Sequence, residues 1–319
     1  MPSVLLASSL DLARSVTNPT VTIECEFGDT VVEGTRYTAA HHQKSGRYQG
    51  RHTGGNMPAP CNDPIIPRLV DGDTVLLSHL DLDSIGGAIR AVHGSGLFER
   101  KEFWNLAEFV DTHGPHKMDP DHPQRETLAA WWAWLTENRP RPDRQNVVNV
   151  TEFVEGAYVV LLSLLFDGPS QDDPRSTGTE AHERLMEAGR AFLAAEARLN
   201  ESSYRASVIL PGDLVLCVRV ADQFTNHLYQ PPRGMGSGVI ADLVLALNTK
   251  TGGVTLSVAD HESSGVNARD LVQTVWRDRD ENGNFLAGGH PGIAGCPRGR
   301  TMTEDDLWYA LGVINRALR

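Results

Sequence analysis

An imidazole and two carboxylates follow a short apolar run in the first third of the chain. The run TVLL at residues 74–77 is typical of a buried strand, and His79, Asp81 and Asp83 come just after it, before two glycines. In extended backbone, alternate side chains point the same way, so this spacing predicts that the three groups converge. Three such ligands at the carboxyl end of a strand indicate a metal site in an α/β protein. The alternative, polar residues that cap the next helix, accounts for one aspartate but not for all three groups.

Composition limits the classes of partner. The 319 residues predict two domains, because a single core rarely exceeds ~250–300 residues. The net charge of 29 − 41 = −12 argues against binding long duplex nucleic acid, which needs several basic contacts to phosphate. A small anionic substrate held by metals and a few arginines remains compatible with this charge. Cys25, Cys61, Cys217 and Cys296 are scattered, which fits neither a disulfide framework nor a zinc ribbon.

The sequence predicts no association with membranes. Residues 1–12 carry an apolar patch without a basic residue before it, which argues against a secretory signal. No apolar stretch approaches the ~18 residues of a membrane span. We therefore expect a cytoplasmic enzyme, or a soluble protein of phage or mobile-element type. The oligomeric state is left open, a homo-oligomer included.

Histidines concentrate in the amino-terminal part, which indicates that the chemistry lies there. Eight of the twelve fall between His41 and His122. Strands are predicted at residues 20–27 and 73–77, and helices at residues 85–93, 124–137 and 151–165. Trp131, Trp132 and Trp134 are expected to pack a core between helices and not to stack on a ligand. The Gly, His and Pro-rich segment 46–67 lacks periodicity and is long for a structureless connection, so a functional role is expected but unassigned.

The carboxy-terminal part alternates strands and helices. A long helix is predicted over residues 181–199, after a breaker cluster at 167–174. Strand-like runs follow at residues 207–210, 214–220, 239–247 and 254–258, then helices at 266–276 and 303–318. We therefore predict an α/β fold of two domains, one with a parallel sheet and a metal site and a smaller one with a mixed sheet. The predicted boundaries are 1–170 for the catalytic domain, 171–204 for a linker helix and 205–319 for the substrate-binding domain.

A glycine-rich motif near the carboxyl end resembles a known domain. Residues 285–295 read FLAGGHPGIAG and follow the predicted strand and helix. This order resembles the DHH-associated carboxy-terminal domain of the DHH phosphoesterase superfamily. The resemblance implies that Gly288, Gly289 and His290 hold the phosphate or nucleotide end of a substrate. Glycines let backbone N–H groups approach an anion closely, and a histidine can donate to it.

Motifs in the amino-terminal part resemble the catalytic domain of the same superfamily. Residues 79–87 resemble the first DHH motif in its RecJ-like form, and residues 106–116 resemble a later motif in which Asp111 completes the metal set. The pair His41-His42 is similar to the two histidines that name the superfamily. The resemblance implies that His41 contacts a metal and that His42 faces the substrate phosphate.

The sequence departs from the pattern of the superfamily at two points. Ala40 stands where an aspartate precedes the histidine pair, and the pair comes before the His-x-Asp-x-Asp motif instead of after it. A permuted catalytic domain would explain the order, because a metal site depends on convergence in space. The bridging aspartate has no clear counterpart, and Glu24, Glu26 or Asp29 could supply it.

The combined motifs predict a metal-dependent phosphoesterase. Asp, Glu and His ligands suit two manganese ions, or magnesium or iron, better than a thiolate-bound zinc. Such paired ions activate a water and stabilise an in-line displacement. The expected substrate is small and phosphorylated: a short oligonucleotide, a cyclic dinucleotide or a nucleoside bisphosphate. The expected ligands are His79, Asp81, Asp83, Asp111 and His41.

Further residues are expected to contact the substrate in a cleft between the domains. His42, with His113 or His116, would stabilise phosphoryl oxygens, and Arg298 would bind the phosphate, whereas Arg277 and Arg279 are expected to face solvent. Ala40 and the missing bridging aspartate also support an alternative, a degenerate non-catalytic nucleotide-binding or regulatory protein. A third reading keeps the scaffold but gives it a non-phosphate substrate, with segment 46–67 setting specificity.

Overall fold

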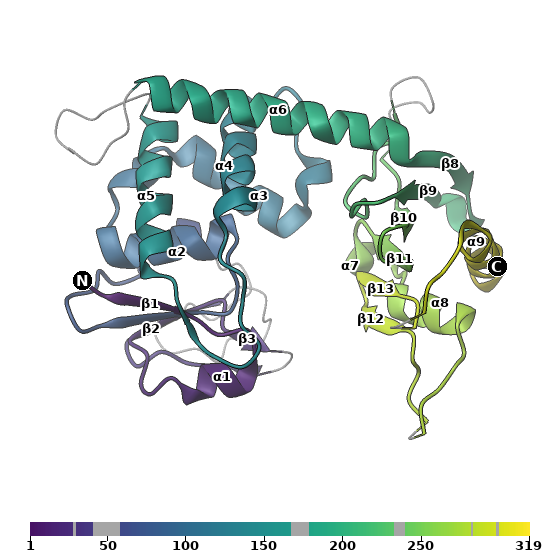
Figure 1. Cartoon of the computed structure of the whole chain (residues 1–319), viewed down its shortest axis with the longest axis horizontal. Coiled ribbons are helices and arrows are strands. Elements are labelled where there is room, and N and C mark those ends of the chain that lie inside the picture. Colours follow the sequence, from purple (N-terminus) through teal and green to yellow (C-terminus); the bar gives the residue numbers. More distant parts are fainter. Residues whose placement is uncertain (28–29, 41–57, 167–178, 233–239, 282, 298–299) are drawn as a thin grey trace. The chain divides into compact units, whose positions relative to one another are not determined.

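The chain forms two compact units, each with its own sheet and helices. The computed structural model describes residues 1–27, 30–40, 58–166, 179–232, 240–281, 283–297 and 300–319. The first unit comprises Met1–Thr112 with Met118–Leu193, and the second comprises His113–Lys117 with Ala194–Arg319 (Figure 1). Both units mix helices with strands, so the predicted two-domain α/β fold class is confirmed.

The first unit is built on a mostly parallel five-stranded sheet. Its strand order is β5-β2-β6-β1-β7, and all neighbours pair in parallel except β7, which is antiparallel to β1. Four strands therefore end at the same edge of the sheet. The strands are β1 (Ser3–Leu6), β2 (Val21–Ile23), β5 (Tyr37–Ala39), β6 (Thr74–Leu77) and β7 (Val148–Asn149).

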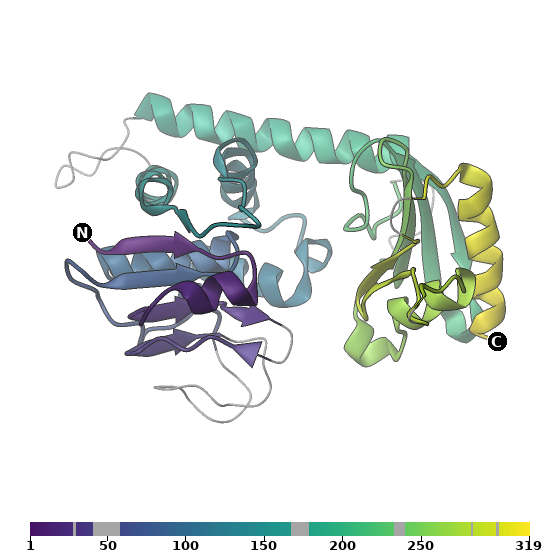
Figure 2. The same cartoon turned by 60° about the horizontal axis from the view of Figure 1, so that its bottom comes forward.

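Helices cover both faces of this sheet, because alternate strand residues point to opposite sides (Figure 2). Val75 and Leu77 of β6 lie in the main core, to which α2 (Leu82–His93) and α5 (Thr151–Leu165) contribute. Leu76, between them, packs in a smaller cluster on the other face with Ala13 of α1 (Leu10–Ser15). The run TVLL is thus buried on both sides, as its composition predicts.

The tryptophans of α4 (Arg125–Asn138) pack between helices, as predicted. Trp131 is buried in the main core, and the ring of Trp134 stacks on Phe153 of α5 with centroids 5.4 Å apart. Trp132 contacts Phe192 of α6 (Thr179–Ser203), the long helix that begins in the first unit and ends in the second. Near its middle, α6 approaches α4 closely, because a Cβ at Gly189 would lie 2.6 Å from the Ala130 nitrogen.

The strand predicted over residues 20–27 is interrupted, which corrects that expectation. Strand β2 ends at Ile23 because Glu24 adopts a φ of 52°, in the left-handed region that extended strands exclude. Glu26 and Phe27 then form a separate strand, β3 (Glu26–Phe27), which pairs with β4 (Thr30–Val31). Helix α3 (Lys101–His113) follows α2 and carries Asp111.

The second unit contains a six-stranded mixed sheet in the order β12-β13-β11-β10-β9-β8. Strands β9 and β10 pair in parallel, and the other neighbours are antiparallel. The predicted glycine turn forms the hairpin β12–β13 at one edge. The strands are β8 (Tyr204–Ile209), β9 (Val215–Ala221), β10 (Leu243–Asn248), β11 (Gly253–Val258), β12 (Gly288–His290) and β13 (Ile293–Gly295).

Helices α8 (Ala268–Val275) and α9 (Glu304–Ala317) complete the core of the second unit. Their apolar residues, such as Val272 and Leu307, pack with Leu245 of β10 in one buried cluster. A short helix, α7 (His261–Ser264), follows β11. The amino-terminal end of α8 is fixed by Asn267, whose side chain accepts from the first backbone N–H groups.

One charged side chain, Arg219 of β9, is completely buried in the second unit. Its guanidinium donates to the carbonyl oxygens of Leu228 and Gln230 and to the backbone and side chain of Asn200, with N–O distances of 2.6 to 3.0 Å. It also donates to the hydroxyl of Ser203. Burial lowers the pKa of Arg219 to about 10, although nearby Cys217 and Tyr204 oppose this. The guanidinium therefore ties the end of α6 to the segment around residue 229.

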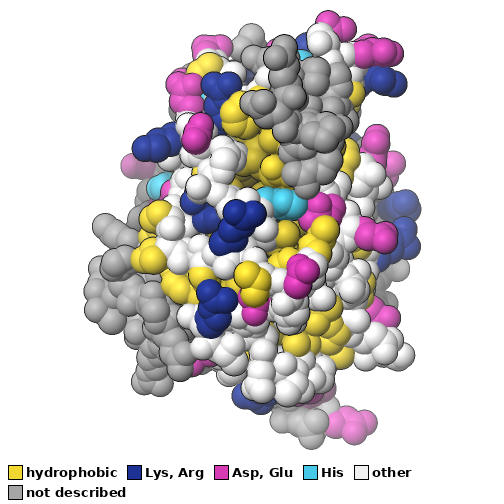
Figure 3. Space-filling model, turned by 90° about the vertical axis from the view of Figure 1, so that its left-hand side faces the viewer, with side chains coloured by type: hydrophobic (Ala, Val, Ile, Leu, Met, Phe, Trp, Pro, Cys, Tyr) yellow, Lys and Arg dark blue, Asp and Glu magenta, His cyan; other side chains and the backbone are white. Residues whose placement is uncertain are grey.

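The described surface carries both signs of charge. On the face in Figure 3, basic and acidic side chains lie interspersed with hydrophobic and uncharged ones. Among the residues that the structure describes, no helix combines the length and the apolar character that a membrane crossing requires.

Candidate functional site

The candidate site lies where β2 and β6 end side by side in the first unit. Ile23 and Leu77 are paired in register, so Glu24 and Ser78 follow at the same edge of the parallel sheet. The Ser78 hydroxyl donates to the backbone carbonyl of Glu24. In parallel sheets of α/β proteins, ligands bind outside the carboxyl ends of the strands.

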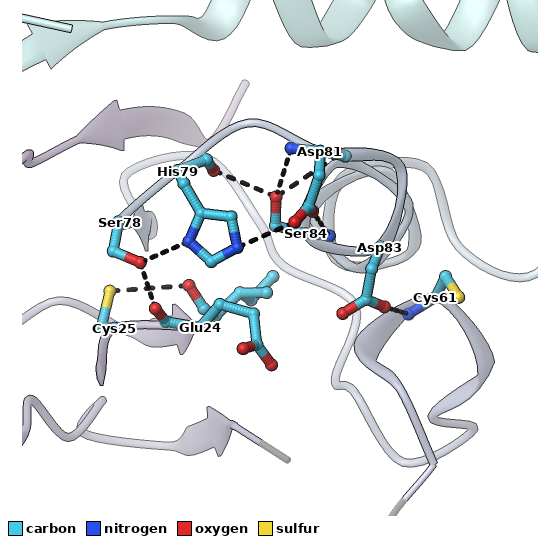
Figure 4. A network of polar contacts seen from close by, with 9 residues as sticks. Glu24, Cys25, Cys61, Ser78, His79, Asp81, Asp83 and Ser84 are labelled. Carbon is cyan, nitrogen blue, oxygen red and sulfur yellow. Dashed lines mark hydrogen bonds and ion pairs between the residues drawn. The ribbon is translucent and has the colours of Figure 1, made fainter. Parts of the chain in front are cut away.

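Glu24 is the most deeply buried carboxylate at this edge. Its side chain is 1% exposed, and its backbone has the left-handed φ of 52°. Figure 4 shows its carboxylate pointing into the space that His79 and Asp83 border. A non-glycine residue in the left-handed region costs free energy and is often found at functional sites.

His79 and Asp81 form an ion pair next to Glu24. His79 Nε2 lies 2.9 Å from Asp81 Oδ2, and His79 Nδ1 lies 2.8 Å from the Ser78 hydroxyl oxygen. Because the Ser78 proton goes to the Glu24 carbonyl, Nδ1–H must donate to Ser78 and Nε2–H to Asp81. Both ring nitrogens then carry a proton, so the contacts favour an imidazolium at position 79.

Asp81 begins helix α2, which corrects the predicted geometry of the motif. Its side chain accepts from Ser84 N–H at 2.9 Å, and the Ser84 hydroxyl lies 3.2 Å from Asp81 N, which completes a capping box. Residues 79–83 are therefore not one extended segment, and Asp83 lies inside the first turn of α2. Helix capping therefore accounts for Asp81, but not for His79 or Asp83, as predicted from the sequence.

Asp83 faces the single-turn helix η1 (Pro60–Asn62) and is 2% exposed. Its Oδ1 accepts from Cys61 N–H at 3.0 Å (Figure 4). The two glycines of the motif permit this contact: a Cβ at Gly86 would lie 2.7 Å from Cys61 Cβ, and one at Gly87 would lie 2.8 Å from Pro60 Cβ. The two glycines thus allow η1 to pack closely against α2.

The carboxylates at this edge influence one another strongly. Burial raises the pKa of Glu24 well above its usual value, and the negative charges of Asp83, Glu26, Asp81 and Asp111 raise it further. Burial alone would lower the pKa of His79, but the hydrogen bond and charge of Asp81, with Asp83 and Asp111, raise it. For Asp81, the opposing contacts from His79 and Ser84 outweigh burial and lower its pKa.

These effects define an acidic cluster, comprising Glu24, Glu26, Asp81, Asp83 and Asp111 with His79 beside them. Asp111 comes from α3 and belongs to the cluster because its charge acts on both Glu24 and His79. Four of the five predicted metal ligands, His79, Asp81, Asp83 and Asp111, thus belong to the first unit and interact through their charges. Glu24 and Glu26, two of the three residues left open as the bridging group, lie here as well.

The chemistry of the acidic cluster fits a hard divalent cation. Carboxylate oxygens and one imidazole are donors that manganese, magnesium and iron accept. A cation would offset the repulsion that raises the pKa of Glu24. As the side chains stand in the described part of the chain, no three His, Cys, Asp or Glu residues form a ready metal-holding group. His79 and Asp81, which pair with each other, would have to turn toward a metal.

Several predicted site residues lie outside the described part of the chain. They are His41, His42, Asp29 and Arg298, together with most of segment 46–67. The sequence places His41 after Ala40, and Ala40 directly follows the end of β5. Their predicted roles remain predictions.

His113 and His116 are grouped with the second unit. His113 is the last residue of α3, and the ring of His116 contacts the ring of Tyr229 at a tilt of 42°, with centroids 4.3 Å apart. Burial, together with the charges of Lys117 and His227, lowers the pKa of His116 to about 4 against the pull of Asp260. His116 is therefore neutral near pH 7. That His116 and the acidic cluster contact the same substrate remains a prediction.

The glycine motif forms an edge hairpin with tight backbone packing. Gly289 has a φ of 153°, and a Cβ there would lie 2.6 Å from the Ile293 carbonyl oxygen, so only glycine fits. The carbonyl of Gly289 accepts from Arg269 Nε at 2.7 Å. Gly288 pairs with Gly295 across the hairpin, and His290 is described through its backbone in β12.

Arg269 and the backbone of Cys61 were not predicted as parts of these sites. Arg269 lies in the first turn of α8, two residues after the Asn267 cap, and this position was the available sequence signal. The contact between Cys61 N–H and Asp83 joins residues 22 positions apart, and no local pattern announces it.

Comparisons with known proteins add no functional information. No protein-family model matches the chain, and neither does any curated protein. The crystal structure of an uncharacterized protein from Helicobacter pylori G27 is similar, with 10% identity and a TM-score of 0.22 over 77% of this chain and 76% of that chain. This similarity is too low to support an argument about fold or function.

Proposed function

We propose that the chain is a metal-dependent phosphoesterase of the DHH superfamily, acting on a small phosphorylated or nucleotide substrate. The observation that carries the proposal is the acidic cluster at the carboxyl edge of a parallel sheet, where Glu24 is buried and lies under the negative charge of four other carboxylates. Burying a carboxylate near other negative charges is unfavourable unless it is protonated or a cation offsets the charge. A cluster of this kind is typical of a functional site.

In this proposal, the first unit holds two manganese ions, with magnesium or iron as the other candidates. The ligands would be His79, Asp81, Asp83 and Asp111 with His41, and Glu24 is our choice for the bridging group. Such ions, when bound, lower the pKa of a water and stabilise charge on phosphoryl oxygens.

Other contacts of the chain would position these ligands and the substrate. The ion pair of His79 with Asp81 describes the metal-free protein, and metal binding would replace it, with loss of a proton from the imidazole. The contact from Cys61 N–H fixes the carboxylate of Asp83. In the second unit, Gly288, Gly289, His290 and Arg298 would bind the phosphate end, and His42 with His113 or His116 would contact phosphoryl oxygens. As a neutral imidazole, His116 would donate one hydrogen bond and add no positive charge.

We propose that the protein is cytoplasmic. We also propose that long duplex nucleic acid is not a substrate. The net charge of −12 supports a small substrate, because a duplex would be repelled. The interspersed charges on the face in Figure 3 agree with this proposal.

The test is hydrolysis of a panel of phosphoesters with manganese: a dinucleotide, a cyclic dinucleotide and a nucleoside bisphosphate. We expect Asp83→Ala to reduce turnover by at least about a thousandfold, because it removes a ligand. Glu137→Ala, which removes an exposed carboxylate of α4, should leave turnover unchanged. Wild-type turnover retained by Asp83→Ala would refute the proposal.

A second candidate, a non-catalytic nucleotide-binding protein, is favoured by one observation. Ala40 stands at the end of β5, where the superfamily pattern has an aspartate. Metal content separates the two functions. Two equivalents of manganese per chain after dialysis support the enzyme, and none, with nucleotide binding retained, supports the binder.

A further inference from the structure

An open groove of about 410 Å³ lies on the second unit between α8 and the hairpin formed by residues 278–281 and 283–286. Its volume is within the range of small-molecule sites, about 300–1,000 Å³. We call it the arginine groove. It is lined by Asp270, Gln273, Thr274, Arg277, Arg279 and Phe285.

The two arginines of the groove are exposed to solvent, as predicted, and each makes a contact within the second unit. Arg279 lies over the ring of Phe285, with its guanidinium carbon 3.7 Å from the ring centroid, and also donates to the Gly283 carbonyl. Arg277 Nε donates to the carbonyl of Thr274 at 3.3 Å, which leaves the two terminal nitrogens of its fork for other acceptors. Guanidinium groups ordered in this way lose less conformational entropy when they bind an anion.

The other lining groups suit the uncharged part of a ligand. Asp270 offers an acceptor for a hydroxyl or an amino group, whereas one face of the Phe285 ring is covered by Arg279. The Gln273 amide donates to the Ala287 carbonyl at 3.3 Å, so its own oxygen can accept a bond from a ligand. Asp270 would repel a phosphate placed beside it, so the phosphate should bind at the Arg277 and Arg279 end.

We propose that the arginine groove binds a nucleoside monophosphate, with the phosphate on Arg277 and Arg279 and the nucleoside hydroxyl or amino groups on Asp270. This site does not depend on the proposed phosphoesterase function, and it shares no residue with the acidic cluster or the glycine hairpin.

Binding of AMP to the metal-free full chain in the presence of a chelator tests the proposal by calorimetry. We expect AMP to bind, and adenosine and inorganic phosphate to bind at least about tenfold more weakly, because each lacks half of the contacts. Arg277→Ala and Arg279→Ala should each weaken AMP binding by about tenfold or more, and Arg279→Lys should recover only part of this loss. The matched control is Arg316→Ala, an exposed arginine of α9, which should not change the affinity.

Hydrogen exchange locates the bound AMP. AMP should slow exchange at Leu286 N–H, which donates to the Asp278 carbonyl in the hairpin, in wild type and in Arg316→Ala but not in Arg277→Ala. The proposal is wrong if wild type does not bind AMP, if both arginine variants bind it normally, or if AMP leaves exchange at Leu286 unchanged. None of these results bears on whether the acidic cluster hydrolyses phosphoesters.

Discussion

The carboxylate of Asp81 serves His79 and the start of α2 at the same time. Its Oδ2 lies 2.9 Å from His79 Nε2, and its Oδ1 lies 2.9 Å from Ser84 N. The position of the imidazole is therefore coupled to the first turn of the helix that carries Asp83.

Substituting Asp81 should separate these two roles. Asp81→Ala removes both contacts and should lower the free energy of unfolding by about 0.5–2 kcal/mol, the range for loss of a helix cap. Asp81→Asn keeps an acceptor for Ser84 N–H but not the charge, so it should cost less. Urea denaturation of the metal-free protein measures both values. Equal losses in the two variants would show that capping does not contribute.

Gly86 should be essential for the packing of η1 against α2. Gly86→Ala places a Cβ 2.7 Å from Cys61 Cβ and 2.8 Å from a ring carbon of Trp104, and should destabilise the protein by about 1–3 kcal/mol. Gly96→Ala is the control, because nothing lies within 4 Å of its added Cβ. Thermal unfolding of the two variants compares them, and an equal shift in both would contradict the packing argument.

Neutralising Glu24 should stabilise the metal-free protein above neutral pH. The pKa of Glu24 is raised in the folded chain, so folding binds an extra proton and stability falls as pH rises from the ordinary carboxyl value toward the raised one. Glu24→Gln removes this loss and should increase Tm at about pH 8, by about 2–4 °C for each kcal/mol recovered.

Manganese should reverse the order of the Tm values of wild type and Glu24→Gln. It should raise the Tm of wild type above that of Glu24→Gln, and a chelator should restore the higher Tm of Glu24→Gln. A lower Tm for Glu24→Gln than for wild type in chelator would argue against repulsion within the acidic cluster.

His116 should make stability depend on pH in the acid range. Its pKa is about 4 in the folded chain, below the ordinary value of 6.5, so the unfolded chain binds the extra proton between these values. Stability from this group is present above about pH 6.5 and is lost as pH falls toward 4. His116→Gln should therefore lose less stability than wild type between about pH 7 and pH 4.5. Urea midpoints at the two pH values test this, and parallel losses would contradict it.

Regular local patterns predicted much of the fold. Helix α5 has the predicted bounds, residues 151–165, and α4 differs by one residue at each end, because helical periodicity is a local property. The break after Ile23 could not be predicted, since the left-handed backbone of Glu24 depends on the neighbouring strands. Strands β5 and β7 are two or three residues long, too short to leave a pattern.

The candidate site was predicted in its residue types but not in its geometry. Asp81 and Asp83 were placed on one extended segment, whereas the cap at Asp81 starts the helix between them. That choice depends on the competition between strand continuation and the hydrogen bond to Ser84, which residue spacing does not encode. Glu24 emerged as the central carboxylate only when the pairing of β2 with β6 was known.

The buried guanidinium of Arg219 has a consequence for how the second unit assembles. Its acceptors come from two parts of the chain. The end of α6 precedes β9, and the carbonyls of Leu228 and Gln230 follow it. Loss of any one of these acceptors would leave a buried positive charge with too few oxygens around it, which is costly. The last turn of α6, β9 and the segment around residue 229 are therefore expected to lose their order together when the second unit unfolds.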